Sequence, residues 1–307
     1  MTEGSAAGAA GAAASAAGVA AAGGGAAGGQ LHVVATPIGN LGDVTCRAIE
    51  VLRAVPLVAA EDTRLTRRLF ARYGIDTHMV SYHARSGLGR QAKLLAHLRS
   101  GRDLALVTDA GTPLVSDPGG ELVSAWASEG GRVVPIPGPS AVLAALVASG
   151  MAAARWTFEG FLPRSGRERR ERLARIADDD RACVIYEAPS RIPATLADLA
   201  AAAGAERRVA VCRELTKVHE EIVRGCLGDL AARAAAGGLT LRGEFAVVVE
   251  AVTASESAAR ARADAPTMAE ARAEVARLVA SGTKRSDAVR QVATATGLDR
   301  RELYRMG

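Results

Sequence analysis

The chain is poor in aromatic residues, lysine and cysteine, and it has no long apolar run. Only 3 % of its 307 residues are aromatic, and three residues are lysine. No apolar run reaches the ~18–20 residues that span a bilayer. The four cysteines lie far apart and form no CxxC pair, which argues against a zinc knuckle and a disulfide framework. We therefore expect a cytoplasmic protein with no metal site and no membrane contact.

The first thirty residues differ in composition from the rest. They hold fourteen Ala and nine Gly, and they lack the basic start of a secretory signal. Such a segment buries too little surface to offset the entropy lost on ordering. We expect residues 1–30 to form a disordered tail, which leaves enough chain for two domains.

After the tail, apolar runs of strand length alternate with segments of helical period. Several runs are apolar throughout, as in strands that helices cover on both faces of a mostly parallel sheet. The predicted fold class is α/β, with two α/β domains over residues 31–145 and 146–252. A linker over 253–266 and a small helical module over 267–307 complete the predicted organisation.

The predicted C-terminal module contains three helices. Thr267 can cap a helix that runs to Ala280, and Gly297 separates a second helix from a short last one. This pattern fits a compact helix-turn-helix. Two interpretations stay open here, namely contact with nucleic acid and a small helical cap that packs on its own chain.

Four loops that follow predicted strands carry most of the chemical signal. Ligands of parallel α/β sheets bind beyond the carboxyl ends of the strands. Residues 108–120 hold three Gly, two Pro and two Asp, although a plain connection needs only about 2–6 residues. Residues 36–43 and 135–141 carry similar Gly and Pro positions. The first of these loops reads GxxG, so it is neither a dinucleotide fingerprint nor a Walker loop. Three such loops favour a polar ligand site.

The fourth loop, residues 60–64, places two carboxylates beside a guanidinium. Glu61, Asp62 and Arg64 directly follow an apolar strand. One interpretation is a helix cap made by Asp62 or Thr63. The other is a group that positions and activates a substrate hydroxyl.

These loops resemble, in order and spacing, the motifs of the small-subunit ribosomal RNA methyltransferase I family. The motifs are Thr36-Pro37-Ile38-Gly39-Asn40-Leu41, Ala60-Glu61-Asp62-Thr63-Arg64, Asp109-Ala110-Gly111-Thr112-Pro113 with Asp117-Pro118-Gly119, and Pro137-Gly138-Pro139-Ser140. The similarity continues through Glu159–Pro163, Tyr186–Pro189, Arg213–Lys217 and Gly243–Phe245. The family belongs to the tetrapyrrole-methylase superfamily. The resemblance implies methylation of a cytidine ribose 2′-hydroxyl in the decoding region of 16S rRNA.

The resemblance also implies a cofactor, a partner and a set of binding residues. It implies S-adenosylmethionine in a cleft between the two domains, 16S rRNA or the small ribosomal subunit as partner, and a homodimer. The cofactor contacts that it implies are Gly39, Asn40, Asp109, Ala110, Gly111, Thr112, Val115, Ser116, Gly138, Ser140, Ala141, Tyr186 and Glu244.

The chain departs from the family pattern at three places. Ser190 followed by Arg191 stands where the family usually has His, and Arg242 replaces the usual Lys before Gly-Glu. The stretch His83–Ser86 lacks the acidic or Asn residues often found there. The first and third departures concern the substrate side, whereas Arg242 keeps the charge.

The implied reaction needs a base or a cation, because a ribose 2′-hydroxyl is a poor nucleophile at neutral pH. A positioned base contributes about 10²–10⁴-fold to such a rate. The candidates for the base are Asp62 and Glu61, with Glu187 and Glu220 as further ones. Arg64 and Lys217 are candidates for stabilising charge or holding phosphate. The alternative for Lys217 is a solvated surface lysine.

An arginine-rich segment offers a surface for RNA. Residues 164–175 hold six Arg and two Glu, and a helix with that balance can follow phosphates. The alternative is an ordinary solvated helix face. Few aromatic residues are available for base stacking, so we expect a folded ribosomal substrate. The predicted RNA contacts are Arg164, Arg167, Arg169, Arg170 and Arg191.

Two other functions remain open from the sequence. One is a C-methyltransferase that acts on a tetrapyrrole and shares fold and cofactor. The amino-acid sequences of the loops, Glu-Asp-Thr-Arg and Asp-Ala-Gly-Thr-Pro, argue against it, and so does the arginine-rich helix. The other is a non-enzymatic nucleic-acid-binding protein that works through its C-terminal helices, which leaves the three ligand-shaped loops unexplained.

Overall fold

The computed structural model describes residues 28–256 and 266–305. The predicted tail lies outside this range except for its last three residues, and so do residues 257–265 of the predicted linker. Contacts divide the chain into two units. Unit 1 comprises the residues up to Thr36 together with Val44–Gly138, and unit 2 comprises Pro37–Asp43 together with the residues from Pro139 onward.

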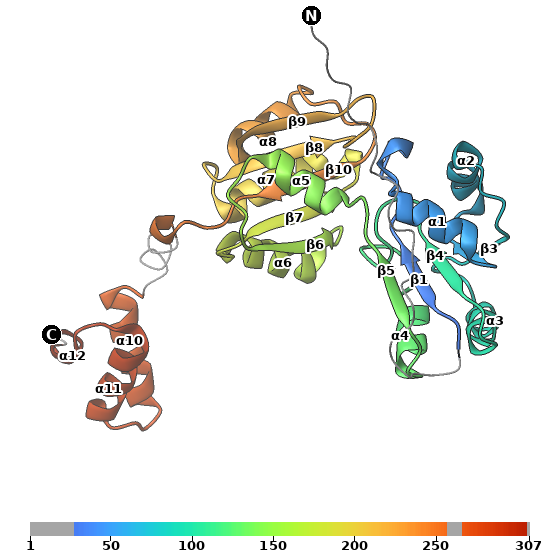
Figure 1. Ribbon diagram of the computed structural model, residues 1–307. Coiled ribbons are helices and arrows are strands. Elements are labelled where there is room, and N and C mark those ends of the chain that lie inside the picture. Colours follow the sequence, from blue (N-terminus) through green and yellow to red (C-terminus); the bar gives the residue numbers. More distant parts are fainter. Residues whose placement is uncertain (1–27, 257–265, 306–307) are drawn as a thin grey trace, which may run out of the picture. The chain divides into compact units, whose positions relative to one another are not determined.

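Unit 1 is built on a five-stranded sheet with the order β3-β2-β4-β1-β5, and every strand pair in it is parallel (Figure 1). Its strands are β1 (Leu31–Val34), β2 (Val58–Ala60), β3 (Met79–Ser81), β4 (Leu104–Val107) and β5 (Val133–Ile136). Its helices are α1 (Cys46–Ala54), α2 (Thr63–Tyr73), α3 (Leu88–Arg99) and α4 (Gly120–Ser128).

Helices cover both faces of the first sheet. Leu52 and Phe70 of α1 and α2 pack on one face, while Leu98 and Leu122 of α3 and α4 pack on the other. Strands β2 and β4 are therefore buried at every position. The parallel sheet predicted from continuous apolar runs is confirmed.

Unit 2 contains a second five-stranded sheet with the order β6-β7-β10-β8-β9. Its strands are β6 (Trp156–Phe161), β7 (Ala182–Glu187), β8 (Arg208–Arg213), β9 (Glu221–Cys226) and β10 (Phe245–Val249). β6 is parallel to β7, whereas the other pairs are antiparallel. The mixed pattern arises because β8 turns back into β9 through the short loop 214–220.

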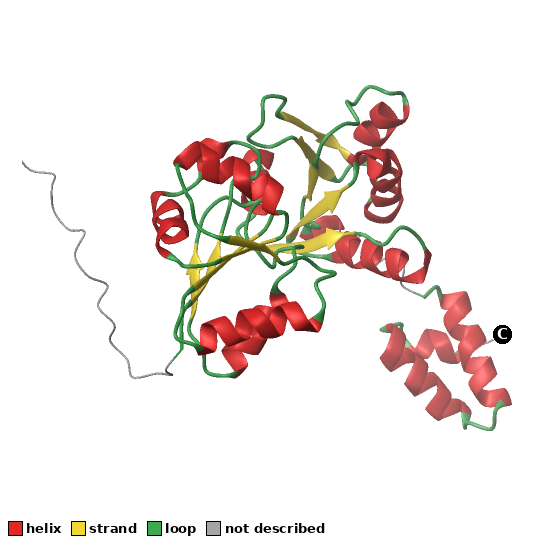
Figure 2. Ribbon diagram, turned by 90° about the vertical axis from the view of Figure 1, so that its right-hand side faces the viewer, coloured by secondary structure: helices red, strands yellow, loops and turns green. Residues whose placement is uncertain are grey.

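Helices also flank the second sheet (Figure 2). They are α5 (Ala141–Ser149), α6 (Gly166–Asp178), α7 (Ile192–Ala203) and α8 (Leu227–Ala235), with short 3-10 turns at Leu41–Asp43 and Pro189–Arg191. Helices α6, α7 and α8 share one core with the sheet. Helix α5 packs on β8 and β10, and the Cys212 thiol reaches the Ala145 carbonyl.

The position of α5 moves the division between the units. We expected the boundary after residue 145, which falls inside α5. Because α5 packs on the second sheet, the units divide at Gly138. Pro37–Asp43, expected in the first domain, groups with unit 2 for the same kind of reason, since Gly39 lies against Lys217.

The C-terminal helices are α10 (Met268–Ala280), α11 (Arg285–Thr296) and α12 (Arg300–Tyr304). Thr267 and Glu270 form a reciprocal capping box at the start of α10. Val275, Val289 and Leu303 belong to a small core that the three helices share. The predicted helices are confirmed. Within the described ranges, no helix is long and apolar enough to cross a membrane.

Candidate active site

In unit 1, the loops that follow β1 and β4 are joined at their start. Thr36 and Gly111 exchange two backbone hydrogen bonds of 2.8 and 3.0 Å, and the Thr36 hydroxyl donates to the Thr108 carbonyl at 3.1 Å. Gly111 adopts a φ of 80°, which a residue without a side chain does at little cost. These bonds fix the loop 108–119 to the end of a neighbouring strand.

Backbone strain is concentrated in two of the candidate loops. Among the described residues, four that are not glycine have positive φ: Leu114 (75°), Ser116 (67°), Glu214 (51°) and Thr216 (66°). The first pair lies in the loop after β4, and the second pair lies between β8 and β9. Such conformations cost of order 1–3 kcal/mol each and cluster at functional sites. Both loops are therefore candidates for a functional role.

Four carboxylates gather where β2 and β4 end. The Asp62 amide donates to Asp109 Oδ1 at 2.9 Å, and the Asp109 amide donates to Glu61 Oε2 at 3.3 Å. Burial raises the pKa of Glu61 and of Asp109. Burial, with the charge of Glu61, raises the pKa of Asp117 to about 6. Carboxylates with raised pKa values at strand ends are typical of active sites.

Asp62 differs from its neighbours. Its Oδ1 caps α2 by accepting from the Arg64 amide at 2.8 Å, and its Oδ2 pairs with Arg64 Nη2 at 2.7 Å. The hydrogen bonds from Arg64 lower the pKa of Asp62 to about 2. The helix-cap interpretation is thus the one that the structure supports. A carboxylate with so low a pKa is a poor base, so Glu61 is the better of the two candidates.

The remaining unit 1 residues of the predicted cofactor set lie on the same two loops and after β5. Ala110 and Ser116 are exposed, Thr112 and Val115 are half-buried, and all four lie in the tied loop after β4. Gly138 follows β5, and a Cβ added there would lie 3.0 Å from the Cβ of Ala35. The loops after β1, β4 and β5 therefore lie at one edge of the sheet, as expected for its carboxyl ends.

In unit 2, Lys217 is the centre of a charged cluster. Its Nζ donates to Glu214 Oε1 at 2.8 Å and to Glu244 Oε2 at 2.9 Å. Partial burial would lower the pKa of Lys217, but these two hydrogen bonds outweigh it and raise the pKa. Lys217 is therefore not the solvated surface lysine of the alternative interpretation, and it stays charged.

The Lys217 cluster is built by strained and closely packed backbone. Glu214 Oε1 also accepts from the Glu244 amide at 2.9 Å, which joins the loop after β8 to the start of β10. A Cβ on Gly243 would meet Glu214 Oε1 at 2.3 Å, and a Cβ on Gly39 would meet Lys217 Cγ at 2.3 Å. Glycine is needed at both positions because the charged side chains fill the space.

The other predicted cofactor residues of unit 2 have defined local roles. Asn40 Oδ1 accepts from the Gly42 amide at 3.0 Å. Ser140 caps α5, which begins at Ala141. Tyr186 lies edge-on between the rings of Phe158 and Phe161.

The two further base candidates are already used by the fold. Glu187 is buried and accepts from the Thr195 hydroxyl at 2.6 Å, and Arg191 Nε lies 3.2 Å from its Oε1. Glu220 accepts from the Thr216 amide at 2.7 Å. Both carboxylates have structural partners, so neither is carried forward as the base.

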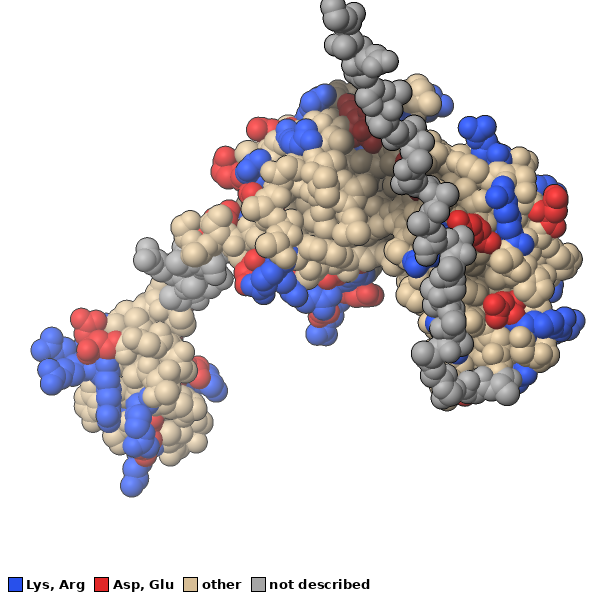
Figure 3. All heavy atoms as spheres, in the orientation of Figure 1, with Lys and Arg blue, Asp and Glu red and all other residues tan. Residues whose placement is uncertain are grey.

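The arginines predicted to bind RNA divide into two groups. Arg169 is buried and contacts Asp198, Thr195 and the Pro163 carbonyl, and Arg191 contacts Glu187 and the carbonyls of Leu162 and Pro163. Their guanidinium groups stabilise unit 2, so we leave both out of the RNA surface. Arg164, Arg167 and Arg170 are exposed, and basic side chains gather over α6 (Figure 3).

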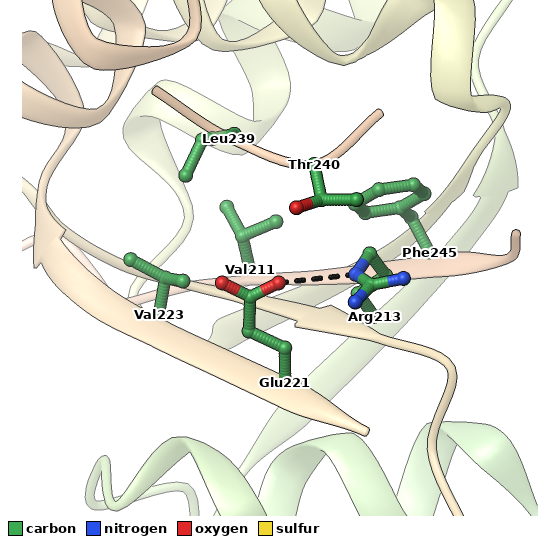
Figure 4. Close-up of a pocket in the computed structure, with 7 residues that line it drawn as sticks. All are labelled: Val211, Arg213, Glu221, Val223, Leu239, Thr240 and Phe245. Atoms are coloured by element: carbon green, nitrogen blue, oxygen red, sulfur yellow. Dashed lines mark hydrogen bonds and ion pairs between the residues drawn. The ribbon is translucent and has the colours of Figure 1, made fainter. Parts of the chain in front are cut away.

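A small pocket is lined by none of the predicted site residues. It is formed on β8, β9 and β10, is mostly apolar, and contains the ion pair between Arg213 and Glu221 at 3.1 Å (Figure 4). It has space for about one water molecule. It is too small to hold a cofactor. Among the described residues, no three His, Cys, Asp or Glu side chains are grouped so that they could hold a metal ion.

The sequence interpretation missed two contributors to these clusters. Asp117 belongs to a quoted motif but was not assigned a role, and Glu214 precedes Lys217 by three residues without being singled out. Asp117 follows Ser116, which adopts a positive φ, and Glu214 adopts a positive φ itself. The pattern of side chains in a sequence does not reveal such backbone conformations.

Comparison of the sequence with known proteins identifies its relatives. The model of the tetrapyrrole (corrin/porphyrin) methylases matches residues 30–231. A ribosomal RNA small subunit methyltransferase I of Synechocystis is 46 % identical over 280 residues, covering 91 % of this chain and 97 % of that protein. The Bacillus subtilis protein of the same name is 39 % identical and covers 90 % of this chain and 93 % of its own length.

Solved structures agree at the level of the fold. A cobalt precorrin-4 methyltransferase has a TM-score of 0.55 at 18 % identity, over 72 % of this chain and 94 % of that one. A Thermus thermophilus uroporphyrin-III C-methyltransferase complexed with S-adenosyl homocysteine has a TM-score of 0.53 at 20 % identity, over 72 % and 97 %. The chain thus belongs to the tetrapyrrole methylase family, and within it to the ribosomal RNA small subunit methyltransferases I.

Proposed function

We propose that this protein transfers a methyl group from S-adenosylmethionine to the ribose 2′-hydroxyl of a cytidine in the decoding region of 16S rRNA. The observation that carries the proposal is the pair of strained loops, one holding Asp109 and Asp117 and the other holding Lys217. Each loop follows a strand, carries charged side chains and holds backbone conformations that non-glycine residues rarely adopt.

The residues present fit S-adenosylmethionine. When bound, this cofactor supplies an electrophilic methyl group on a positively charged sulfur. Glu61, Asp109 and Asp117 provide negative charge that complements such a cation. The loop 108–119 is fixed in place by Thr36 and Gly111, so its exposed backbone is ordered before a ligand arrives. Gly39, Asn40, Gly138, Ser140, Ala141, Tyr186 and Glu244 remain proposed contacts.

The protein's own contribution is alignment, proton removal and charge stabilisation. Methyl transfer is an in-line displacement, so rigid loops that fix the reacting groups supply much of the acceleration. Glu61 is the proposed base, because burial raises its pKa and it is not paired with an arginine as Asp62 is. Glu214 and Glu244 use two of the three N–H donors of Lys217. In the proposal, the third donor stabilises the developing alkoxide or holds an adjacent phosphate. Arg64 pairs with Asp62, and its side chain, which is 85 % exposed, is the proposed phosphate contact.

The proposed partner is 16S rRNA within the small ribosomal subunit. Arg164, Arg167 and Arg170 form the proposed phosphate-binding surface. Such a substrate places the enzyme in the cytoplasm, as the composition predicts. The homodimer stays a prediction, which light scattering on the purified protein tests.

The two alternative functions have less support. A tetrapyrrole C-methyltransferase shares the fold, but those structures are about 20 % identical to this chain whereas the ribosomal RNA methyltransferases are 39–49 % identical. A non-enzymatic nucleic-acid-binding protein leaves the strained loops without a use.

A substrate comparison tests the proposal. The purified protein is incubated with S-adenosylmethionine carrying a labelled methyl group and, separately, with small ribosomal subunits that lack the modification, with naked 16S rRNA and with uroporphyrinogen. We expect label in the RNA of the first or second reaction and none in the third. Label in the porphyrinogen, or in no substrate, contradicts the proposal.

A further inference from the structure

Strand β6 forms one edge of the second sheet and contains an irregularity near its end. Its pairing with β7 runs Phe158 opposite Val184, then Gly160 opposite Ile185 and Phe161 opposite Tyr186. One extra residue, Glu159, is therefore inserted in β6. Gly160 adopts a φ of 60°, the left-handed conformation that such bulges use. Side chains alternate between faces along a regular strand, so residues 158 and 161 would otherwise point to opposite faces.

The bulge brings two phenylalanine rings to the same face. Phe158 packs edge-to-face on Tyr186 with centroids 4.9 Å apart, and Phe161 packs on the same ring at 5.7 Å. These spacings lie in the favourable range for edge-to-face pairs. In a chain with so few aromatic residues, three of them form one contiguous cluster.

The outer ring of the cluster is exposed yet held in place. Phe161 is 53 % exposed, although the strand end that carries it is fixed. Arg172, whose side chain is 18 % exposed, donates to the carbonyls of both Glu159 and Phe161 and pairs with the Glu159 carboxylate at 2.8 Å. An exposed aromatic ring on fixed backbone loses little entropy when a flat ligand stacks on it.

We propose that Phe161 is a stacking platform for a nucleobase of the RNA substrate. The inference rests on the proposed function for the identity of the RNA and adds a base contact to it. The chain directly after Phe161 favours nucleic acid over a second protein surface. Residues 164–175 hold six Arg against two Glu, and Arg164 and Arg167 are exposed within six residues of the ring. Proteins hold unpaired bases and their phosphates with exposed aromatic faces and cationic side chains, and this stretch of chain supplies both within a few residues. An unpaired base near the methylated nucleotide is therefore the predicted occupant.

The experiment measures the dissociation constant of the full-length protein for small ribosomal subunits that lack the modification, by filter binding at fixed salt. Phe161→Ala is expected to weaken binding about tenfold, the size of one lost base stack. Phe161→Trp is expected to bind as the unmodified protein does. Phe161→Leu keeps the apolar bulk without a π-face and is expected to bind as weakly as the alanine variant. Trp156→Ala is the matched control, because Trp156 is a 40 % exposed aromatic residue at the other end of β6 and outside the ring cluster.

Four outcomes would contradict the stacking role of Phe161 or the proposed function. Unchanged binding by Phe161→Ala, or full binding by Phe161→Leu, overturns the stacking role. A lower molar mass of Phe161→Ala in light scattering shows that the ring contacts a second copy and also overturns it. If the unmodified protein binds subunits but transfers no methyl group, the proposed function fails, while the order of the Phe161 variants still tests the platform.

Discussion

Lys217 holds a positive charge in a position that its own surroundings maintain. Glu214 and Glu244 accept two hydrogen bonds from its ammonium group, and the hydrogen bond from Lys217 lowers the pKa of Glu214 in turn. Glu214 achieves this with a backbone φ of 51°, a conformation that few non-glycine residues adopt. The strained backbone at Glu214 thus helps to hold the Lys217 ammonium group in one position.

Replacing Lys217 by alanine tests this role. Removing a donor aimed at developing negative charge costs about 10²–10³-fold in kcat. We expect Lys217→Ala to lower kcat for methylation of small subunits by that factor with a smaller change in KM. Lys93→Ala on α3, an exposed lysine, is the control and is expected to retain full activity. Near-normal turnover by Lys217→Ala would show that the charge has no part in the reaction.

The Asp117 carboxyl group is expected to lower the free energy of unfolding at neutral pH. Its pKa is raised from an ordinary value near 3.8 to about 6, so the folded state holds its proton more tightly than the unfolded state does. Its contribution to the free energy of unfolding is therefore largest below pH 4 and is lost as the pH rises through about 6. Since the side chain is half-buried, solvent screening reduces the loss to about 1–2 kcal/mol.

The variant Asp117→Asn cannot ionise at this position. We expect it to be more stable than the unmodified protein by about 1–2 kcal/mol at pH 7, with the difference vanishing below pH 4. Urea unfolding at several pH values measures this. A variant that is equally or less stable at pH 7 would contradict the raised pKa.

At the scale of elements, a single loop joins β1 to the Lys217 cluster. Pro37–Asp43 leaves the first sheet and packs with unit 2, where Gly39 lies against the aliphatic part of Lys217. A Cβ added at Gly39 would lie 2.3 Å from Lys217 Cγ, so the lysine side chain would have to move.

Gly39→Ala is therefore expected to displace Lys217 and to lower kcat at least tenfold while the protein stays folded. Gly89→Ala on α3 is the matched control, since a Cβ there has no atom within 4 Å. Methylation kinetics and thermal unfolding of both variants are compared. Full activity of Gly39→Ala would mean that Lys217 need not stay where the structure places it.

Much of the element order could be predicted because apolar runs and helix caps are local signals. The apolar runs Ala182–Glu187 and Arg208–Arg213 form the strands β7 and β8, and Thr267 caps the helix that its position indicates. The antiparallel part of the second sheet was not distinguished, because strands buried on both faces look alike in either direction.

The side-chain assignments were harder, because they depend on tertiary partners. Asp62 and Arg169 carry the right charges for catalysis and RNA binding, but Arg64 and Asp198 engage them. Asp117 and Glu214 gain their importance from neighbours distant in sequence, such as Glu61 and Glu244. No spacing rule within one strand or helix reveals such contacts.

The whole molecule carries a small net charge of +5, so we expect the proposed RNA binding to depend on how the charge is distributed. Arg164, Arg167 and Arg170 are exposed on or next to α6, whereas Arg169 and Arg172 are held by the fold. Binding through the first group releases counterions from RNA, and the affinity then falls steeply with salt.

We expect each neutralised arginine of this group to lower the slope of log affinity against log salt by about 0.7–0.9. Subunit binding by Arg167→Ala is measured from low to moderate salt. Arg208→Ala is the control, because Arg208 is also an exposed arginine near a glutamate but lies on β8. Equal slopes for the two variants would exclude α6 from the RNA surface.

Methylation of one cytidine ribose in small-subunit RNA is the activity to which all of the proposed residue roles lead. Ribose methylation is mapped across 16S rRNA from cells with and without this protein, and again after a gene for the Lys217→Ala variant is returned. We expect one 2′-O-methylcytidine in the decoding region to disappear without the protein and not to be restored by the variant. An unchanged map in cells that lack the protein would contradict it.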